Sequence, residues 1–566
     1  MELLARLKMP AKRLYSSVLV TLVFIGQCLS RDQLRLLSYT KLASYPDPAH
    51  LAPVYRLHGG AAAAGAYDGD AHVLYVIGDV SPVVHVLDLS DPGSPHLLVD
   101  HLFTPTQGQP RGVDVCGGEL AIVMTSSSDV YEGHVMFYKT YSQDVKKLWY
   151  LRTVPVGSSP SHVLYSGDCK TLVVTNEGLP GKDASNKFVD PEGSVTILRK
   201  DRTDTWSEQT SDFKKFNGRS DIRHPSACVN TTTFAASSSL WQDLQPSYSS
   251  ISPDGHTVFV SLQDNNAIAR VSVRGGEVTG IYSLGAKNWN QSRLDPSDQD
   301  GGPNLATYPI YGMYQPRAMK LLQKGGRAYL VTADEGRIRE YSVGRHGFSW
   351  SEAAAASVGS LSAGTQNNTL ADMLRRPDKL GRLLISKCDV ISPGIHDIKA
   401  FGGRGFSIWD TSHLTHGPVY NSGGEVEEVN QLLLDNVFNT DVTSSVTSSP
   451  ENMRDASSKD FGPKLSALDV VEDNGKTYLV LGSHTMGSLY LYTVDMGSLT
   501  TDLNHVYRQG GTRQTMQDMY RQGTAGDVGI SDIRLISSRQ TPANKTLAVV
   551  ISNGSGTVSV YEIEPS

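Results

Sequence analysis

The sequence is short of positive charge. Its 51 Lys and Arg residues stand against 58 Asp and Glu, which gives the 566-residue chain a formal net charge of −7. Proteins that bind nucleic acids present clustered basic side chains to phosphates, so this balance argues against a nucleic-acid partner. The acidic excess is also too small for a strongly polyanionic protein. Charged residues make up 19% of the chain and hydrophobic residues 39%, the balance of an ordinary globular protein.

Signature motifs of hydrolases are also missing. The chain contains neither a Gly-x-Ser-x-Gly elbow nor a His-Glu-x-x-His pair. Its histidines are scattered, without the close spacing that zinc sites use. The 16 histidines include His58, His162, His224, His396, His413, His416 and His484. The motifs therefore give little support for an enzyme.

The sequence lacks an apolar run long enough for an ordinary membrane span, which takes about 20 residues. A basic segment precedes the shorter apolar run VLVTLVFIGQCL (residues 18–29), and Ser30 follows it. This order is typical of a cleaved signal peptide over residues 1–30; an uncleaved signal anchor is the alternative. The final strand-like VSVYEIEPS carries no apolar tail. We expect a secreted chain without a transmembrane segment, and cleavage would take its formal charge from −7 to −10.

What the chain has in abundance is short β-rich hairpins. Alternating or β-branched runs bounded by Gly, Asn, Asp and Ser recur along it, with no convincing amphipathic helices between them. One supersecondary unit used many times is the mark of a repeat architecture. The clearest copies are residues 75–89, 171–198, 257–273, 328–343, 477–494 and 547–563, and residues 120–138 form a looser one.

A second repeat, centred on proline, precedes the hairpins. Each copy stands before an apolar strand, and with a unit near His58 and another near Asp527 the repeat makes seven units. Seven four-stranded sheets around a channel form a β-propeller, and the strand after each proline would be the innermost one, beginning at the channel mouth. The copies read Gln109-Pro110-Arg111, Ser159-Pro160-Ser161, Gln245-Pro246-Ser247, Gln315-Pro316-Arg317 and Gly462-Pro463-Lys464.

This register predicts one all-β domain over residues 31–566, a seven-bladed β-propeller with long inter-strand loops. Residues 34–42 would complete the last sheet, and residues 404–410 and 418–422 would form the outer strands of blade five. An insertion of about residues 344–395 would interrupt that blade, and its small-residue run EAAAASVGSLSAG is expected to be a mobile loop. The Ser/Thr-rich segment of about residues 440–458 is expected to be a second flexible loop.

The few cysteines and the glycosylation sequons fit an exported chain. After the apolar run, four cysteines remain, and an even number favours disulfides with three connectivities open. Cys116 and Cys169 occupy the same place in successive repeats, so we pair them first; buried free thiols are the alternative. The other two cysteines are Cys228 and Cys388. Asn-x-Ser/Thr sequons occur at Asn230, Asn290, Asn367, Asn544 and Asn553.

Several segments resemble one family. VVTNEGLPG…VDPEGSVTIL, ISPDGHTVFVSLQDNNAIARV, YLVTADEGRIREY and FGGRGFSIWD are similar to the choice-of-anchor I proteins, and within them to the mesenchyme-specific cell-surface glycoproteins. The resemblance runs from about residue 35 to 563. It implies a secreted or surface-anchored seven-bladed propeller. Animal members are associated with skeleton and shell formation, and bacterial relatives are described as phosphatase- or phytase-like. The anchor signal that names the group is missing here.

The chain departs from that family beside the prolines. The family often carries acids there, as in Glu-Pro-Glu or Pro-Asp, whereas this chain carries Arg111, Arg317 and Lys464. Cations oppose a metal ion at the same place and could instead meet phosphate or carbonate through charge-assisted hydrogen bonds. The alternative is that each cation pairs with a nearby acid or points into solvent.

Acids survive in the hairpin turns instead. They are Glu177, Asp190, Glu192, Asp334 and Glu335. The first three belong to a long polar excursion between two strands, which we interpret as a loop that carries ligands over one propeller face. Carboxylate oxygens suit Ca²⁺. The alternative is that these acids only accept hydrogen bonds from turn amides.

From these features we expect a secreted, glycosylated and non-enzymatic component of a calcified extracellular matrix. It would bind Ca²⁺ weakly and contact a mineral surface or other matrix proteins. Two alternatives stay open. A calcium-dependent phosphoesterase of the propeller type would need a cluster of carboxylates around metal ions at one channel mouth. A receptor-like module for a protein partner would need an exposed apolar patch.

Overall fold

The computed structural model describes residues 31–46, 52–126, 128, 130–203, 205–228, 239–343, 348–359, 368–389 and 398–566. The predicted signal peptide, residues 1–30, lies outside the described residues. So do the sequons' Asn230 and Asn367 and parts of the predicted 344–395 insertion. Among the described residues, no helix combines the length and apolar character needed to cross a bilayer.

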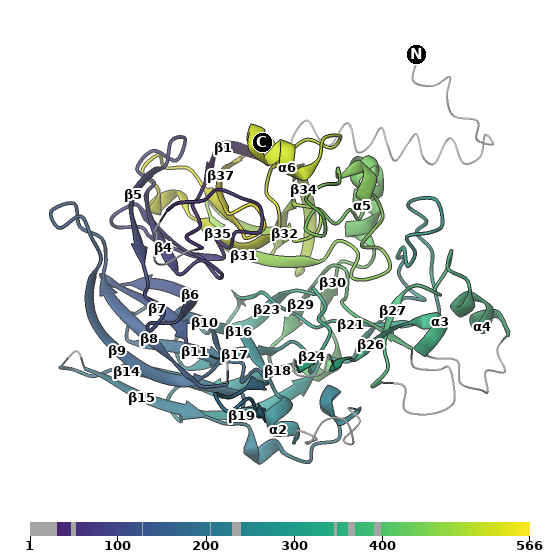
Figure 1. The fold of residues 1–566 in the computed structure, drawn as a ribbon, viewed down its shortest axis with the longest axis horizontal. Helices are drawn as coiled ribbons and strands as arrows, with labels where there is room; N and C mark the ends of the chain where they lie inside the picture. The colour runs from purple at the N-terminus through teal and green to yellow at the C-terminus, as the bar shows by residue number, and fades with distance from the viewer. Residues whose placement is uncertain are drawn as a thin grey trace.

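Seven four-stranded sheets dominate the described chain. Their innermost strands contact one another in chain order, and β35 contacts β2, so the sheets close into a ring. Figure 1 shows the sheets following one another around the molecule from purple to yellow. The prediction of an all-β propeller is confirmed. The innermost strands are β2 (Ala64–Asp68), β6 (Gln109–Cys116), β10 (Pro160–Tyr165), β16 (Pro246–Ile251), β22 (Met319–Lys324), β31 (Leu465–Asp473) and β35 (Ile530–Ile536).

The remaining strands of each sheet follow outward in antiparallel order. The second strands are β3 (Val73–Ile77), β7 (Glu119–Thr125), β11 (Thr171–Asn176), β17 (Thr257–Leu262), β23 (Arg327–Ala333), β32 (Lys476–Ser483) and β36 (Leu547–Ser552). The third strands are β4 (Val83–Asp88), β8 (Glu132–Lys139), β14 (Ser194–Lys200), β18 (Ala267–Ser272), β29 (Phe406–Asp410), β33 (Ser488–Asp495) and β37 (Thr557–Glu564). The outer strands are β5 (His96–Leu102), β9 (Trp149–Ser158), β15 (Trp206–Ser211), β19 (Glu277–Ser283), β30 (Tyr420–Asn421), β34 (Thr500–Arg508) and β1 (Gln33–Lys41).

The hydrophobic core lies between neighbouring sheets rather than at one centre. Because each sheet is covered on both faces, its middle strands are apolar on both sides, and every residue of β3 and β36 is buried. In the outer strand β15, by contrast, most residues are exposed to solvent. An apolar cluster fills each junction between sheets, including that between the last and first, where Val549 and Val558 pack with Leu74. Burial of these clusters holds the ring closed.

The first described strand closes the last sheet. β1 pairs with β37 in antiparallel register, with Leu34 opposite Ile563 and Lys41 opposite Thr557. The two strands lie side by side at the top of Figure 1 although they come from opposite ends of the described chain. The expectation that residues 34–42 complete the last sheet is confirmed. Joining the two ends in one sheet removes an exposed edge from the ring.

The chain between β23 and β29 leaves the ring and returns to it. β29 and β30 then complete the fifth sheet of the ring, as predicted. Part of it joins a five-stranded sheet, whose strands in order are β20 (Ala286–Asn288), β21 (Tyr311–Met313), β28 (Lys399–Ala400), β27 (Leu384–Ser386) and β26 (Ala353–Ala355). The run EAAAASVGSLSAG contributes β26 and the short helix α3 (Ala356–Gly359). These elements and α4 (Asn368–Arg375) lie at one edge of the molecule in Figure 1. The other helices are α2 (Leu240–Asp243), α5 (Glu425–Leu433) and α6 (Met516–Gln522).

The Ser/Thr-rich segment 440–458 has no strand but is well packed. Val442 and Met453 are buried in a cluster with residues of α6. Its backbone bonds to distant segments, since Val442 donates to Thr485 at 2.9 Å and Met516 donates to Ser448 at 3.0 Å. The segment therefore bridges the region before β31 to the region before β35.

Two disulfides join separate parts of the ring. Cys116 and Cys169 form the predicted bond between the second and third sheets. Cys228 bonds Cys388 across a sequence separation of 160 residues, which ties the segment before α2 to the five-stranded sheet. Disulfides are typical of proteins outside the reducing cytosol.

Candidate functional site: the channel mouth

The inner strands surround a polar cavity of about 550 Å³ at one mouth of the channel. Its wall takes side chains from all the inner strands or the residues just before them. The residues that line it at these strand starts are Ala64, Arg111, Ser161, Ser247, Arg317, Lys464 and Ser531. The predicted placement of the proline motifs at the channel mouth is thereby confirmed for Arg111, Arg317 and Lys464.

A β-bulge near the start of several inner strands directs these side chains. The pairing of β6 with β7 skips one residue, and the same irregularity recurs in other sheets. The skipped residues are Arg111, Ser161, Ser247 and Ser531. Such bulges re-aim a side chain. In β31 the skipped residue is Ser466, so the predicted equivalence of Lys464 with Arg111 is wrong by two residues, although both line the cavity.

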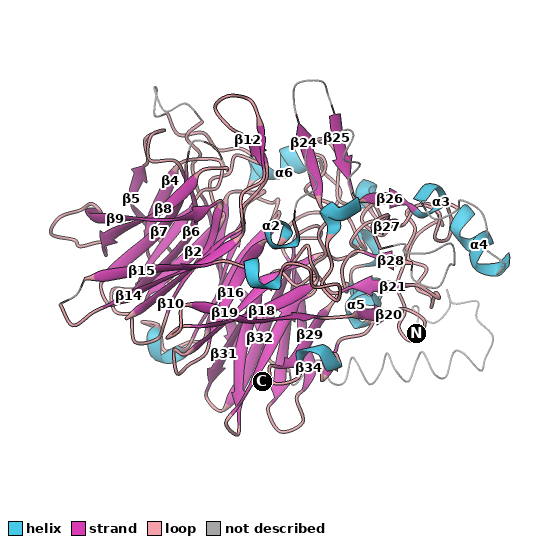
Figure 2. Ribbon diagram, turned by 90° about the horizontal axis from the view of Figure 1, so that it is seen from below, coloured by secondary structure: helices cyan, strands magenta, loops and turns pink. Residues whose placement is uncertain are grey.

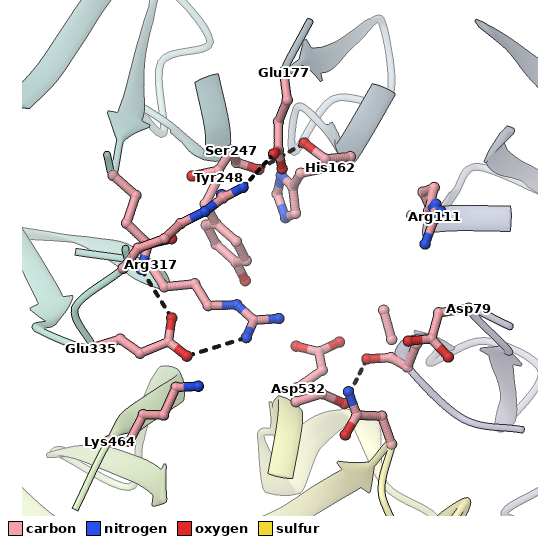
Figure 3. A pocket seen from close by; sticks show the side chains of 18 of the residues that line it. Asp79, Arg111, His162, Glu177, Ser247, Tyr248, Arg317, Glu335, Lys464 and Asp532 are labelled. Atoms are coloured by element: carbon pink, nitrogen blue, oxygen red, sulfur yellow. Dashed lines mark hydrogen bonds and ion pairs between the residues drawn. The ribbon is translucent and has the colours of Figure 1, made fainter. Parts of the chain in front are cut away.

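The three predicted cations differ in how they are paired. Arg111 is exposed, and no described residue forms a hydrogen bond or ion pair with it. Arg317 lies 3.5 Å from Glu335, and the Lys464 ammonium stands 5.1 Å from the centre of the Phe461 ring. Figure 3 shows Arg111 entering the cavity opposite Arg317 and Lys464. The mouth therefore offers cationic groups from opposite sides of one space.

Two of the predicted calcium ligands, Glu177 and Glu335, line the cavity, and both are already engaged. Glu177 accepts a hydrogen bond from Arg337 at 3.1 Å. Glu335 accepts one from Gln263 at 2.9 Å. Burial acts to raise the pKa of Glu335, but the charges of Arg317 and Lys464 hold this pKa below its usual value. Both carboxylates thus carry negative charge that arginines balance, rather than forming an open set for a metal ion.

The other predicted calcium ligands lie elsewhere. Asp334 is fully buried beneath β29, where Ser407 donates to it at 2.5 Å and Thr332 at 2.8 Å; burial raises its pKa to about 7. Glu192 pairs with Lys214 at 2.6 Å. The backbone carbonyl of Asp190 accepts from Gln242 at 3.0 Å. None of the five predicted ligands belongs to the group of three potential metal ligands found among the described residues.

The long excursion after β11 forms a small hairpin beside the mouth. Its strands are β12 (Gly181–Lys182) and β13 (Phe188–Val189). β12 contacts β24 (Glu340–Val343), which pairs with β25 (Phe348–Ser351), and Glu340 lines the cavity. Figure 2 shows β12, β24 and β25 projecting on the same side of the molecule. The predicted loop over one propeller face is therefore present, but Glu177 alone of its three acids lines the cavity.

Other side chains of the inner strands add aromatic and ionic groups to the lining of this cavity and of a second one that shares His162, Tyr248 and Arg534. His162 packs on Tyr248 with ring centres 3.9 Å apart. Arg534 bonds Asp532 at 3.2 Å, and Lys320 bonds Asp469 at 2.8 Å. Burial, and then the charges of Arg534 and Lys320, lower the pKa of His162 to about 3. His162 is therefore a neutral ring at physiological pH.

One group of potential ligands was missed by the sequence analysis. Asp295, Asp300 and Asp455 bring carboxylate oxygens within 4.8 Å of one another. The acidic, glycine-ended stretch DPSDQDGG, residues 295–302, was a usable signal for the first two. No local pattern connects it to Asp455, which is 155 positions further along the chain from Asp300.

The described sequon asparagines differ in exposure. Asn290 and Asn544 are exposed. Asn553 is half-buried and lines the channel-mouth cavity. The first two are therefore open to a glycan, whereas a glycan on Asn553 would compete for space with a ligand at the mouth.

The fold and the site together define a β-propeller whose channel mouth is lined by both cations and acids. The model of the choice-of-anchor I domain matches residues 64–496. Since the matched residues make up most of the chain, the chain belongs to the choice-of-anchor I domain family.

Two relatives match parts of the chain. Gigasin-3a of Magallana gigas is 27% identical over 187 residues, which are 32% of this chain and 64% of that protein. The mesenchyme-specific cell surface glycoprotein of Strongylocentrotus purpuratus is 30% identical over 148 residues, 26% of this chain and 18% of that protein. The matches thus span less than two thirds of either relative.

Similar solved structures are distant. Hydrazine synthase of Kuenenia stuttgartiensis has a TM-score of 0.44 and 12% identity, covering 91% of this chain and 98% of that one. The periplasmic gluconolactonase of Pseudomonas aeruginosa has a TM-score of 0.38 and 10% identity, covering 84% of this chain and 98% of that one. Neither likeness bears on activity.

Proposed function

We propose that this protein is a secreted, non-enzymatic glycoprotein of a calcified extracellular matrix, and that its channel mouth binds oxyanions such as the phosphate or carbonate of a mineral. The observation that carries the proposal is Arg111. It faces the cavity without a partner among the described residues, opposite Arg317 and Lys464. Arginine presents donors that suit planar or tetrahedral oxyanions.

The context supports an extracellular role. Both disulfides and the exposed sequons at Asn290 and Asn544 are those of an exported protein. One relative, 30% identical to this chain over 148 residues, is named as a cell surface glycoprotein. Acidic groups of another matrix protein carry the same oxyanion chemistry as a mineral surface and are an alternative source of the ligand.

A phosphoesterase has less support. Catalytic metals of a phosphatase need several converging carboxylates, whereas Glu177 and Glu335 at this mouth are held by Arg337 and Arg317. A hydrolase that used these two carboxylates would have to break two ion pairs before binding metal.

Replacing Arg111 by alanine should weaken binding of inorganic phosphate to the mature protein about tenfold or more. One charge-assisted hydrogen bond contributes about 1.5 kcal/mol or more, and about 1.4 kcal/mol is tenfold in affinity. Calorimetric titration with phosphate measures this, and adsorption to calcium phosphate and calcium carbonate particles tests the mineral. Arg202→Ala removes the same charge from an exposed turn between β14 and β15 and is the matched control.

A p-nitrophenyl phosphate assay on the same samples separates the two functions. Saturable phosphate binding without turnover, lost in Arg111→Ala and kept in Arg202→Ala, is the expected result. Turnover that depends on added metal would replace this proposal with the phosphoesterase. Equal binding by both variants would show that the mouth is not the oxyanion site.

A further inference from the structure

Three aspartates from two distant segments meet in the interior. Asp295 and Asp300 come from the chain between β20 and β21, and Asp455 comes from the Ser/Thr-rich segment. Asp295 is 0% exposed and Asp455 5%. Their carboxylate oxygens all lie within 4.8 Å of one another. Oxygens this close can bind one Ca²⁺ ion together, because Ca–O distances of about 2.4 Å allow ligands on opposite sides of the ion to lie about 4.8 Å apart.

The group lacks a direct ion-pair partner within the described residues. None of the three aspartates has an ion pair there, and the neighbouring Arg382 and Arg454 bind Asp298 and Asp435 instead. Among the described residues, the carboxylate of Asp295 accepts hydrogen bonds only from the backbone N–H groups of Asn304, at 2.7 Å, and Ser297, at 3.2 Å. Three buried like charges at this spacing need either protons or a bound cation.

A fourth carboxylate adds an independent sign of a missing ligand. Glu427, on α5, is 1% exposed, and its Oε2 atom has no hydrogen-bond partner. Its Oε1 atom accepts from Arg404 at 3.0 Å, and the same guanidinium nitrogen bonds the Asp295 carbonyl at 2.6 Å. A buried unpaired carboxylate oxygen is costly.

A second chain of contacts places Glu427 against Asp455. Asn439 donates to Glu427 at 2.8 Å and to Ser458 at 2.9 Å, and Ser458 donates to Asp455 at 2.5 Å. The charge of Glu427 acts on the pKa values of both Asp295 and Asp455. The free Oε2 atom therefore belongs to the same polar pocket. An oxygen of Asp300 and the side-chain oxygen of Asn439 there also lack partners.

We propose that Asp295, Asp300 and Asp455, supported by the Glu427 carboxylate, bind one Ca²⁺ ion. All available donors are oxygen, which favours a hard cation over zinc or copper. The irregular spread of ligands over two loops suits Ca²⁺, which takes six to eight oxygens in flexible geometry, better than Mg²⁺, which demands a near-ideal octahedron. The ion joins the chain before β21 to the segment before β31. This site is separate from the channel mouth and does not depend on its function.

Calcium titration of the full mature chain, stripped with EGTA, tests the site. We expect one Ca²⁺ per chain by calorimetry and a rise in the midpoint of thermal unfolding, because a ligand that binds only the folded state stabilises it. Asp455→Asn should lower Ca²⁺ affinity at least about tenfold and abolish this rise. In EGTA it should unfold no earlier than the wild type, since it replaces one of the crowded carboxyl groups with a neutral amide.

Matched variants make the result decisive. Asp298→Asn changes the same loop, but Asp298 is paired with Arg382 at 2.9 Å or less, so it should keep the full Ca²⁺ response. Asp300→Asn, at a half-buried position, is the second test should Asp455→Asn fail to fold. No heat and no thermal shift up to millimolar Ca²⁺ would overturn the proposal. So would a response lost in Glu177→Gln at the channel mouth but kept in the aspartate variants.

Discussion

Replacing Arg404 by alanine should lower the free energy of unfolding by about 3–5 kcal/mol. Arg404 lies in the segment FGGRGFSIWD and is 2% exposed. Its guanidinium donates to Glu427 at 3.0 Å and to the carbonyls of Asp295, at 2.6 Å, and Ser458, at 2.5 Å. Alanine would remove the cationic partner of a buried carboxylate and the donor to two buried carbonyls. Denaturant unfolding in calcium-free buffer measures the loss.

Arg404→Lys distinguishes charge from geometry in this network. Lysine keeps the positive charge but lacks the planar fork that reaches several acceptors at once. We expect it to recover less than half of the loss. A change below about 1 kcal/mol for alanine would mean that Glu427 takes up a proton or another partner at little cost, and that Arg404 does not hold these loops together.

Acidification from pH 7.5 to 4.5 should destabilise the wild type relative to His162→Gln by about 2–3 kcal/mol. In the unfolded chain a histidine takes up a proton as the pH falls below about 6.5. In the folded chain, burial and then Arg534 and Lys320 keep the ring neutral until pH about 3. The unfolded state alone gains the proton, so stability present above pH 6.5 is lost as the pH falls.

Urea unfolding of both proteins at the two pH values measures this difference. His96→Gln, at an exposed position on β5, is the control for the substitution itself and should follow the wild type. His484 should add a second, separate loss, because burial and then the Lys464 charge lower its pKa to about 4. Parallel pH profiles for the wild type and His162→Gln would show that His162 is protonated in the folded channel.

Most of the fold could be predicted because it is encoded in short repeated patterns. The hairpin runs and the proline motifs recur with enough regularity to indicate a ring of sheets, and the position of Cys116 and Cys169 within two repeats indicated their pairing. The outer strands of the fifth sheet could be recognised although a long insertion separates β23 from β29. The exact register of each inner strand was harder to predict, because the β-bulge in β31 falls at Ser466 and not at Lys464.

The candidate sites could be predicted only in part. Three cations expected at the channel mouth do line one cavity, because the register of the inner strands brings the ends of distant repeats together. The sequence did not show which charged groups at the mouth are paired. Arg337, for example, pairs with Glu177, which lies 160 positions away in the sequence. The acidic group at Asp455 was missed for the same reason.

The sequence by itself determined the β-rich repeat, the closed architecture and the residue types at the start of each inner strand. These features depend on the order of neighbouring residues and on alternating burial, which a single strand or hairpin already carries. Only the tertiary structure decided which charges meet. Asp300 and Asp455, or Arg404 and Glu427, acquire their chemistry from segments far apart in the sequence that the closed ring brings together. Whether a buried charge is paired depends on those contacts, which lie far apart along the chain.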